Sequence, residues 1–88
     1  MDQLTKVFWD ACADGDFARV CSCIAIGVDV NYTNGEGRTA LMRSAKRGHL
    51  DIVRRLVDNG ANVTLKDANN KTALMGAAKK GHLNICRM

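Results

Sequence analysis

Apolar and polar positions follow a helical period between Thr39 and Gly48. Ser44 and Ala45 follow Leu41 by three and four residues, so these side chains share one face of a short helix. The Thr39 hydroxyl can accept a hydrogen bond from a backbone N–H that the first turn leaves unpaired. Gly48 suits the positive φ at which many helices end. The pattern therefore predicts one short helix between these two residues.

A second apolar stripe follows directly. Leu50, Val53 and Leu56 lie on one helical face, and Gly60 ends the pattern. Beyond it, residues 67–70 read Asp-Ala-Asn-Asn, a composition that favours an exposed turn. These positions predict a second short helix, followed by a projecting hairpin loop.

The same arrangement recurs at a period of 33 residues. Thr-Ala-Leu-Met occurs at 39–42 and again at 72–75, and Gly48-His49-Leu50 returns at 81–83. A pair of helices this short cannot bury its own apolar face, so each unit must stack on the next. The period divides the chain into two full units and an incomplete third, namely 1–33, 34–66 and 67–88.

The repeated segments resemble the ankyrin repeat family. The pattern T-A-L-M-x-x-A-x-x-G-H-L-x-I covers 39–52 and 72–85, while N-G-A-N-V covers 59–63 and I-G-V-D-V-N covers 26–31. The resemblance implies an all-α solenoid of stacked helix-turn-helix repeats with short hairpin loops, forming a single domain over residues 1–88. The family's usual T-P-L-H is T-A-L-M here, and losing the proline costs some rigidity at the helix start.

The first unit departs furthest from the pattern. Lys6 stands where the other units have the capping threonine, and Phe8, Trp9 and Phe17 enlarge the expected core. A terminal, capping repeat has these features.

The third unit ends at Met88, inside its second helix. We expect Leu83, Ile85 and Cys86 to lack a full layer of partners there, which leaves an exposed apolar edge. Three explanations stay open. The chain is a piece of a longer array, its edge self-associates with another copy, or the last unit is frayed.

Charge is distributed unevenly over the units. The net charge is +4, yet the first unit has two basic and five acidic residues. The second unit has seven basic and three acidic residues, and the third has four basic residues and one acidic residue. Arg43, Lys46 and Arg47 share one helix face, and Lys79 and Lys80 follow one period later. In ankyrin-like proteins, hairpin tips and the ends of first helices line a concave surface that binds proteins. The resemblance therefore implies a mostly basic partner-binding set: Glu36, Arg38, Arg43, Lys46, Arg47, Lys66, Asn69, Lys71, Lys79 and Lys80.

This set predicts an acidic protein partner. A solvated face that only keeps the chain soluble is the alternative, because charged runs on helices often have no other role. Trp9, Met42 and Met75 stand one period apart, and interhelical packing is favoured over a ladder contacted by a partner. His49 and His82 are predicted to join adjacent loops by hydrogen bonds, since a metal site needs more converging ligands.

The cysteines do not show the paired spacing of a zinc site. Cys12, Cys23 and Cys86 take the places of apolar residues in the second unit, so we expect them in the core, whereas Cys21 is expected to be exposed and oxidisable. No catalytic constellation or phosphate-binding glycine motif is present, so the sequence predicts neither an enzyme nor a cofactor.

The leading hypothesis is a non-enzymatic protein–protein interaction module or scaffold. Nucleic-acid binding is an alternative, motivated by thirteen basic residues but weakened by the presence of only four aromatic ones. A purely structural fragment of a longer array is another. The start Met1–Leu4 does not resemble a secretory signal and no apolar stretch is long enough to span a membrane, so we expect a cytoplasmic or nuclear protein.

Overall fold

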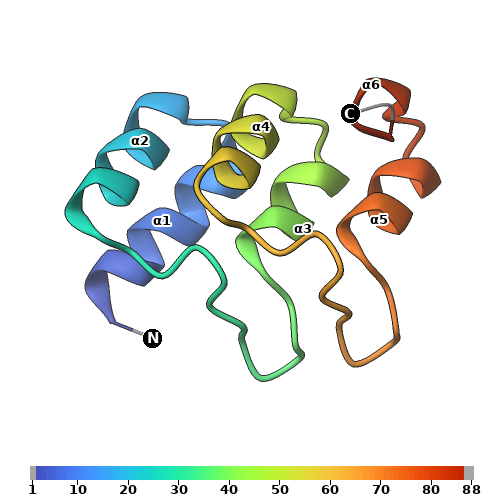
Figure 1. The fold of residues 1–88 in the computed structure, drawn as a ribbon, viewed down its shortest axis with the longest axis horizontal. Helices are drawn as coiled ribbons and strands as arrows, with labels where there is room; N and C mark the ends of the chain where they lie inside the picture. The colour runs from blue at the N-terminus through green and yellow to red at the C-terminus, as the bar shows by residue number, and fades with distance from the viewer. Residues whose placement is uncertain (1, 87–88) are drawn as a thin grey trace.

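The computed structural model describes residues 2–86. Its secondary structure consists of helices, without a strand in the described part of the chain, and the helices form successive antiparallel pairs (Figure 1). In chain order they are α1 (Gln3–Asp14), α2 (Phe17–Ile26), α3 (Ala40–Lys46), α4 (Leu50–Asp58), α5 (Ala73–Lys79) and α6 (Leu83–Cys86).

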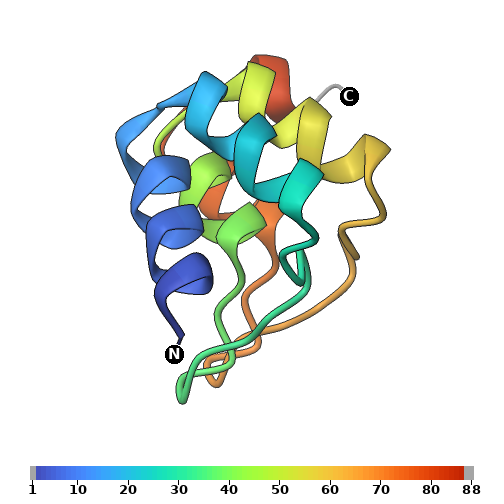
Figure 2. The same ribbon diagram turned by 90° about the vertical axis from the view of Figure 1, so that its left-hand side faces the viewer.

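The pairs stack side by side in two layers. Helices α1, α3 and α5 form one layer and α2, α4 and α6 form the other, as Figures 1 and 2 show. Helix α3 packs between α1 and α5, and α4 packs between α2 and α6. The loops that connect successive pairs project beyond the layers as hairpins (Figure 2). The predicted all-α stack of helix pairs is confirmed.

Threonine caps begin α3 and α5 as predicted. The Thr39 Oγ1 accepts a hydrogen bond of 3.3 Å from the Met42 N–H, and the Met42 Sδ in turn accepts one of 3.4 Å from the Thr39 N–H. Thr72 Oγ1 accepts an equivalent bond of 3.3 Å from the Met75 N–H. The methionine thus takes the place that Glu or Gln holds in a capping box.

Helix α1 begins earlier than the repeat pattern predicts. Asp2 caps it by accepting a hydrogen bond of 2.8 Å from the Thr5 N–H, and its bonds to Thr5 lower the pKa of the Asp2 carboxyl. Lys6, aligned with the capping threonines, lies inside the helix and forms an ion pair of 3.5 Å with Asp10. Lys6 therefore takes no part in capping, because the Asp2 carboxylate already accepts a hydrogen bond from a free N–H of the first turn.

The core lies where the helix pairs meet. Phe8, Ile52 and Leu56 have 0% exposure, and Ala45 and Ala77 are equally inaccessible, which lets α3 and α5 approach their neighbours closely. The small residues at these two positions thus serve packing.

Phe17 and Ala78 are less buried than Phe8 and Ala77. Phe17 is half-buried: it packs against the core cluster, and the Arg55 guanidinium carbon lies 5.5 Å from its ring centroid. Ala78 is exposed, because among the described residues no further helix covers that side of α5.

The third pair exposes apolar side chains at its outer edge. Leu83 is 58% exposed, as expected, and Leu74 is 44% exposed. Ile85, however, is 1% exposed, so its predicted lack of partners is wrong; α6 packs on α4 and turns this side chain inward. Cys86 is half-buried. Self-association through this edge stays a prediction.

Histidines link consecutive units. The His49 Nε2 lies 3.0 Å from the Ala13 carbonyl oxygen, and the His82 Nε2 lies 2.9 Å from the Lys46 carbonyl oxygen. A carbonyl only accepts, so Nε2 carries the proton in each imidazole. The predicted hydrogen bonds between adjacent loops are confirmed, and they hold each turn against the unit before it.

Replacing Gly76 with alanine should stabilise the protein. Gly76 lies inside α5 without a positive φ, and a Cβ there would meet only the Lys46 Cβ, at 3.8 Å. We expect Gly76→Ala to raise the free energy of unfolding by about 0.5–1 kcal/mol, because glycine is the poorer helix former. Urea titration followed by circular dichroism measures this.

Gly81→Ala is the matched control. Its added methyl also meets nothing within 4 Å, but Gly81 has φ +78°, so alanine there should destabilise by about 1–2 kcal/mol. A lower unfolding midpoint for Gly76→Ala would contradict the view that α5 tolerates a side chain at this position.

Candidate protein-binding groove

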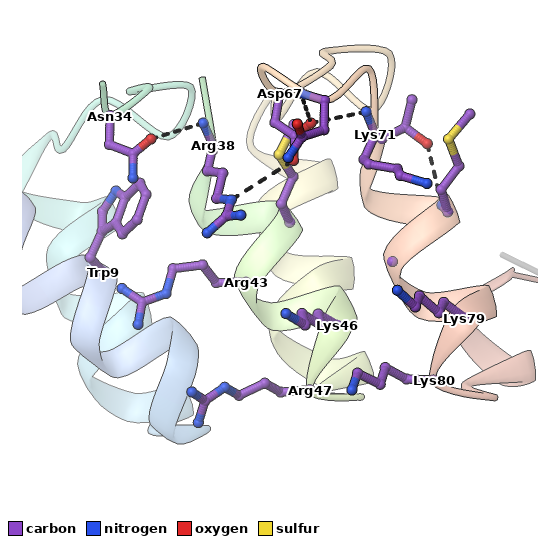
Figure 3. Close-up of a pocket in the computed structure, with 15 residues that line it drawn as sticks. Trp9, Asn34, Arg38, Arg43, Lys46, Arg47, Asp67, Lys71, Lys79 and Lys80 are labelled. Atoms are coloured by element: carbon purple, nitrogen blue, oxygen red, sulfur yellow. Dashed lines mark hydrogen bonds and ion pairs between the residues drawn. The ribbon is translucent and has the colours of Figure 1, made fainter. Parts of the chain in front are cut away.

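One face of the stack is hollowed into a groove of about 820 Å³. Helices α1, α3 and α5 and both hairpins contribute to its walls (Figure 3). We call this surface the basic groove. Its charged lining consists of the carboxylate of Asp67 and seven cations: Arg38, Arg43, Lys46, Arg47, Lys71, Lys79 and Lys80.

Each hairpin is held by one side-chain oxygen at its base. Asn34 Oδ1 accepts hydrogen bonds from two backbone N–H groups, including that of Arg38 at 3.0 Å. One period later, Asp67 Oδ1 accepts bonds from the N–H groups of Asn69 at 2.8 Å and Lys71 at 3.0 Å. The two hairpins therefore present their basic residues in equivalent positions.

Direct contacts also join the hairpins to each other. The Ala68 N–H donates to the Glu36 carbonyl oxygen at 2.9 Å, and Arg38 Nε lies 3.8 Å from Asp67 Oδ2. The pKa of the Asp67 carboxyl is lowered, first by the hydrogen bond from the Lys71 N–H and further by the Arg38 charge. Asp67 stays ionised at neutral pH and anchors one cation of the groove.

Most groove cations have no acidic partner within the described residues. The ion pairs in residues 2–86 join Lys6 to Asp10, Arg19 to Asp16, and Arg38 to both Glu36 and Asp67. Of the seven groove cations only Arg38 takes part in one of these pairs. Figure 3 shows Arg43, Lys46, Arg47, Lys79 and Lys80 in two successive rows on α3 and α5. Like charges at this density create a field that attracts anions.

Trp9 forms the end of the groove at α1. The Arg43 guanidinium carbon lies 5.0 Å from the Trp9 ring centroid, a cation–π arrangement, and the Tyr32 ring meets the indole edge-on at 6.2 Å. Trp9 is only 5% exposed, as packing requires, and its buried Nε1 has no hydrogen-bond partner among the described residues. Met75, one of its equivalents, is 49% exposed and does not follow the packing prediction.

Eight of the ten residues selected from the sequence line the basic groove. The two that do not are Glu36, an exposed residue paired with Arg38 at 3.7 Å, and Lys66, which is exposed outside the groove. The lining residues that the selection missed are Trp9, Asn34, Met42, Asp67, Thr72, Met75 and Gly76. Their shared signal is again the period of 33, which places Met42 beside Met75 and Asn34 beside Asp67.

The cysteines contribute no surface chemistry to this groove. Cys12 and Cys23 are buried as expected, and burial raises the pKa of the Cys12 thiol to about 12 and also raises that of Cys23. Cys21 is half-buried and therefore less exposed than predicted. Within residues 2–86 no group of three or more His, Cys, Asp or Glu side chains is arranged to hold a metal ion.

Helix length bears on membrane insertion. None of the helices formed by the described residues has the length and apolar character that crossing a bilayer requires.

Comparison with known proteins identifies the repeats. The family model for ankyrin repeats (3 copies) matches residues 8–88. The chain is 39% identical over 62 residues to the ankyrin repeat and KH domain-containing protein mask-1 of Caenorhabditis elegans, covering 70% of this chain. It is 40% identical over 48 residues, or 54% of the chain, to acyl-CoA-binding domain-containing protein 1 of Arabidopsis thaliana.

A bacterial relative is also similar. The ankyrin repeat protein YahD of Escherichia coli (strain K12) is 34% identical over 53 residues, or 60% of this chain. The matches span only 2%, 14% and 26% of the lengths of mask-1, the Arabidopsis protein and YahD. The similarity is therefore to their repeat segments.

Proposed function

This chain belongs to the ankyrin repeat family, and from that premise we propose that its basic groove binds an acidic segment of a partner protein. Ankyrin repeats are generally protein–protein interaction modules, and the family is generally non-enzymatic. This chain acts in the same way, as a binding module or scaffold without catalysis of its own.

The unpaired cations support this proposal most directly. Six of the seven groove cations lack an acidic partner in residues 2–86, although acidic residues are present elsewhere on the surface. Lys79 and Lys80 follow Lys46 and Arg47 by one period, so an extended segment lying across α3 and α5 meets a cation pair on each helix. Carboxylates spaced along such a segment complement both rows.

Aromatic burial favours a protein over a nucleic acid. Single-stranded nucleic acids bind to stacking platforms of exposed aromatic rings. Here Phe8 and Trp9 are buried, and Phe17 and Tyr32 are half-buried, with Phe17 facing the Arg55 guanidinium and Tyr32 meeting the edge of Trp9. The basic groove therefore offers positive charge but no exposed aromatic ring on which a nucleic-acid base could stack.

Reversing charge in both rows tests the proposal. The double variant Arg47→Glu/Lys80→Glu should bind a fluorescein-labelled glutamate-rich peptide about tenfold more weakly, since each reversal costs about 0.5–1 kcal/mol of interaction at an exposed site. Fluorescence anisotropy measures the affinity, and affinity for the wild-type protein should fall as salt increases.

Arg54→Glu/Lys66→Glu is the matched control. It makes the same charge change at two exposed positions outside the groove, and it should bind the peptide with nearly wild-type affinity. Equal weakening in both double variants would show an effect of net charge alone and refute the groove proposal. Random-sequence duplex DNA serves as a second ligand; tighter binding of DNA than of the peptide at the same salt would favour a nucleic-acid partner instead.

A further inference from the structure

Arg43 covers Trp9 at one end of the basic groove. Its guanidinium carbon lies 5.0 Å from the ring centroid, and the indole beneath retains only 5% exposure. Figure 3 shows the Arg43 side chain reaching back from α3 toward α1. The long side chain of Arg43 on α3 thus covers the apolar ring of Trp9 on the neighbouring helix α1.

The equivalent position between α3 and α5 lacks such a covering side chain. Met42 stands one period after Trp9, and Gly76 stands one period after Arg43. Gly76 has no side chain that could extend over Met42, which is half-buried and lines the groove. Met42, Met75 and Gly76 all line the basic groove, and we call the uncovered surface that they form the opening.

Folding does not require glycine at this opening. The φ of Gly76 is not in the left-handed region, and a Cβ would meet only the Lys46 Cβ, at the ordinary contact distance of 3.8 Å. Glycine inside a helix is also unfavourable relative to alanine. Close helix packing is therefore not the reason for a glycine at this position.

The residues around Gly76 suit an aromatic ring. Met42 and the 49%-exposed Met75 supply thioethers, which make favourable contacts with aromatic edges. Lys46 and Lys79 stand on the same two helices and supply cations that can lie over a ring face. An exposed methionine beside an empty position offers apolar area inside an otherwise cationic surface.

We propose that the opening over Gly76 binds an aromatic side chain carried by the acidic partner segment. The inference rests on the proposed function, because the flanking acidic residues bring the segment into the groove. The cations then favour acidic segments in general, and the Met42–Gly76–Met75 opening favours those acidic segments that carry an aromatic residue.

Two peptides and one filled opening test this inference. The probes are a short glutamate peptide with one central tryptophan and the same peptide with alanine at that place. The wild-type protein should bind the tryptophan peptide about fivefold more tightly, the gain typical of one good aromatic contact. Gly76→Leu should reduce this ratio, measured between the two peptides on the same variant, to about one.

A second variant gives a different signature. Gly76→Arg places an arginine at the position equivalent to Arg43, where it can cover Met42. This variant should bind the alanine peptide more tightly because of its added charge, but it should lose the preference for tryptophan. Ala25→Leu places the same leucine side chain at an exposed position of α2 outside the groove, and it should keep the wild-type ratio.

The outcomes separate the two proposals. If the acidic peptides bind but tryptophan gives no advantage, or if Gly76→Leu keeps the advantage, the aromatic site is wrong and the basic groove stands. If neither peptide binds the wild-type protein, the acidic-segment function is wrong and the aromatic site is overturned with it. Circular dichroism of each variant confirms that its helices are intact.

Discussion

Truncating Phe8 to alanine is expected to lower the free energy of unfolding by about 3–5 kcal/mol. Phe8 is 0% exposed in α1 and belongs to the core cluster that joins the first two helix pairs. The substitution removes buried apolar area and leaves a cavity that α2 and α3 cannot fill without moving. For a domain whose total stability is typically about 5–15 kcal/mol, this is a large fraction.

The repeat supplies an internal control for this loss. Leu74 occupies the same position two periods later but is 44% exposed. Leu74→Ala should therefore cost well under half as much as Phe8→Ala, although both remove a large apolar side chain at one repeat position. Urea unfolding followed by circular dichroism measures both. Equal losses would show that burial at this position does not fall from the first pair to the third.

Placing alanine at Gly48 is expected to cost about 2–3 kcal/mol, by two separate mechanisms. Gly48 has φ +79°, a left-handed conformation that a Cβ disfavours. The new Cβ would also lie 2.8 Å from the His82 Cε1 and Nδ1, so the imidazole must move. Moving it breaks the bond of 2.9 Å to the Lys46 carbonyl oxygen.

A double-mutant cycle separates these mechanisms. In a His82→Ala background the steric part disappears, so Gly48→Ala should cost only the backbone penalty of about 1–2 kcal/mol. Gly60→Ala is the single-site reference, because Gly60 has φ +91° and its Cβ would meet nothing within 4 Å. If Gly48→Ala costs the same with and without His82, the imidazole does not constrain this turn.

The repeat period predicted most of the fold because neighbouring units solve the same packing problem. Thr39 and Thr72 cap their helices, and His49 and His82 bond to the preceding unit, at the positions the alignment assigned. Each of these roles depends on local backbone geometry and on one adjacent unit, so an identical residue one period away makes the same contact.

The prediction failed where a unit lacks an equivalent neighbour. Helix α1 starts at Gln3, ahead of the aligned position Lys6, because Asp2 provides a cap that has no counterpart in the other units. Burial of Ile85 was missed because α6 packs on both α5 and α4, and Ile85 is enclosed without a further layer. Periodicity describes the interior of a stack and says little about its outermost elements.

The sequence predicted most of the basic residues that line the groove, but it did not predict the opening at Gly76. The basic residues could be selected from sequence because helical spacing places Arg43, Lys46 and Arg47 on one face. Glu36 and Lys66 were included by proximity to the hairpins, but the direction of a loop side chain is not fixed by its spacing. The opening at Gly76 is recognised by comparison with Arg43, whose contact with the Trp9 ring is not given by sequence spacing.

The histidine bonds give the array a polarity. Each imidazole bonds to a carbonyl oxygen of the unit before it. If residues 34–66 were duplicated directly after Lys66, the histidine of the copy could bond to the Lys46 carbonyl oxygen. The carbonyl oxygen of the copied lysine would then accept the bond from His82. The same copy joined ahead of the first unit would form one bond fewer, because Asp16 stands where the imidazole is needed. Duplication of this gene segment would thus lengthen the protein, and its cationic surface, most readily in one direction.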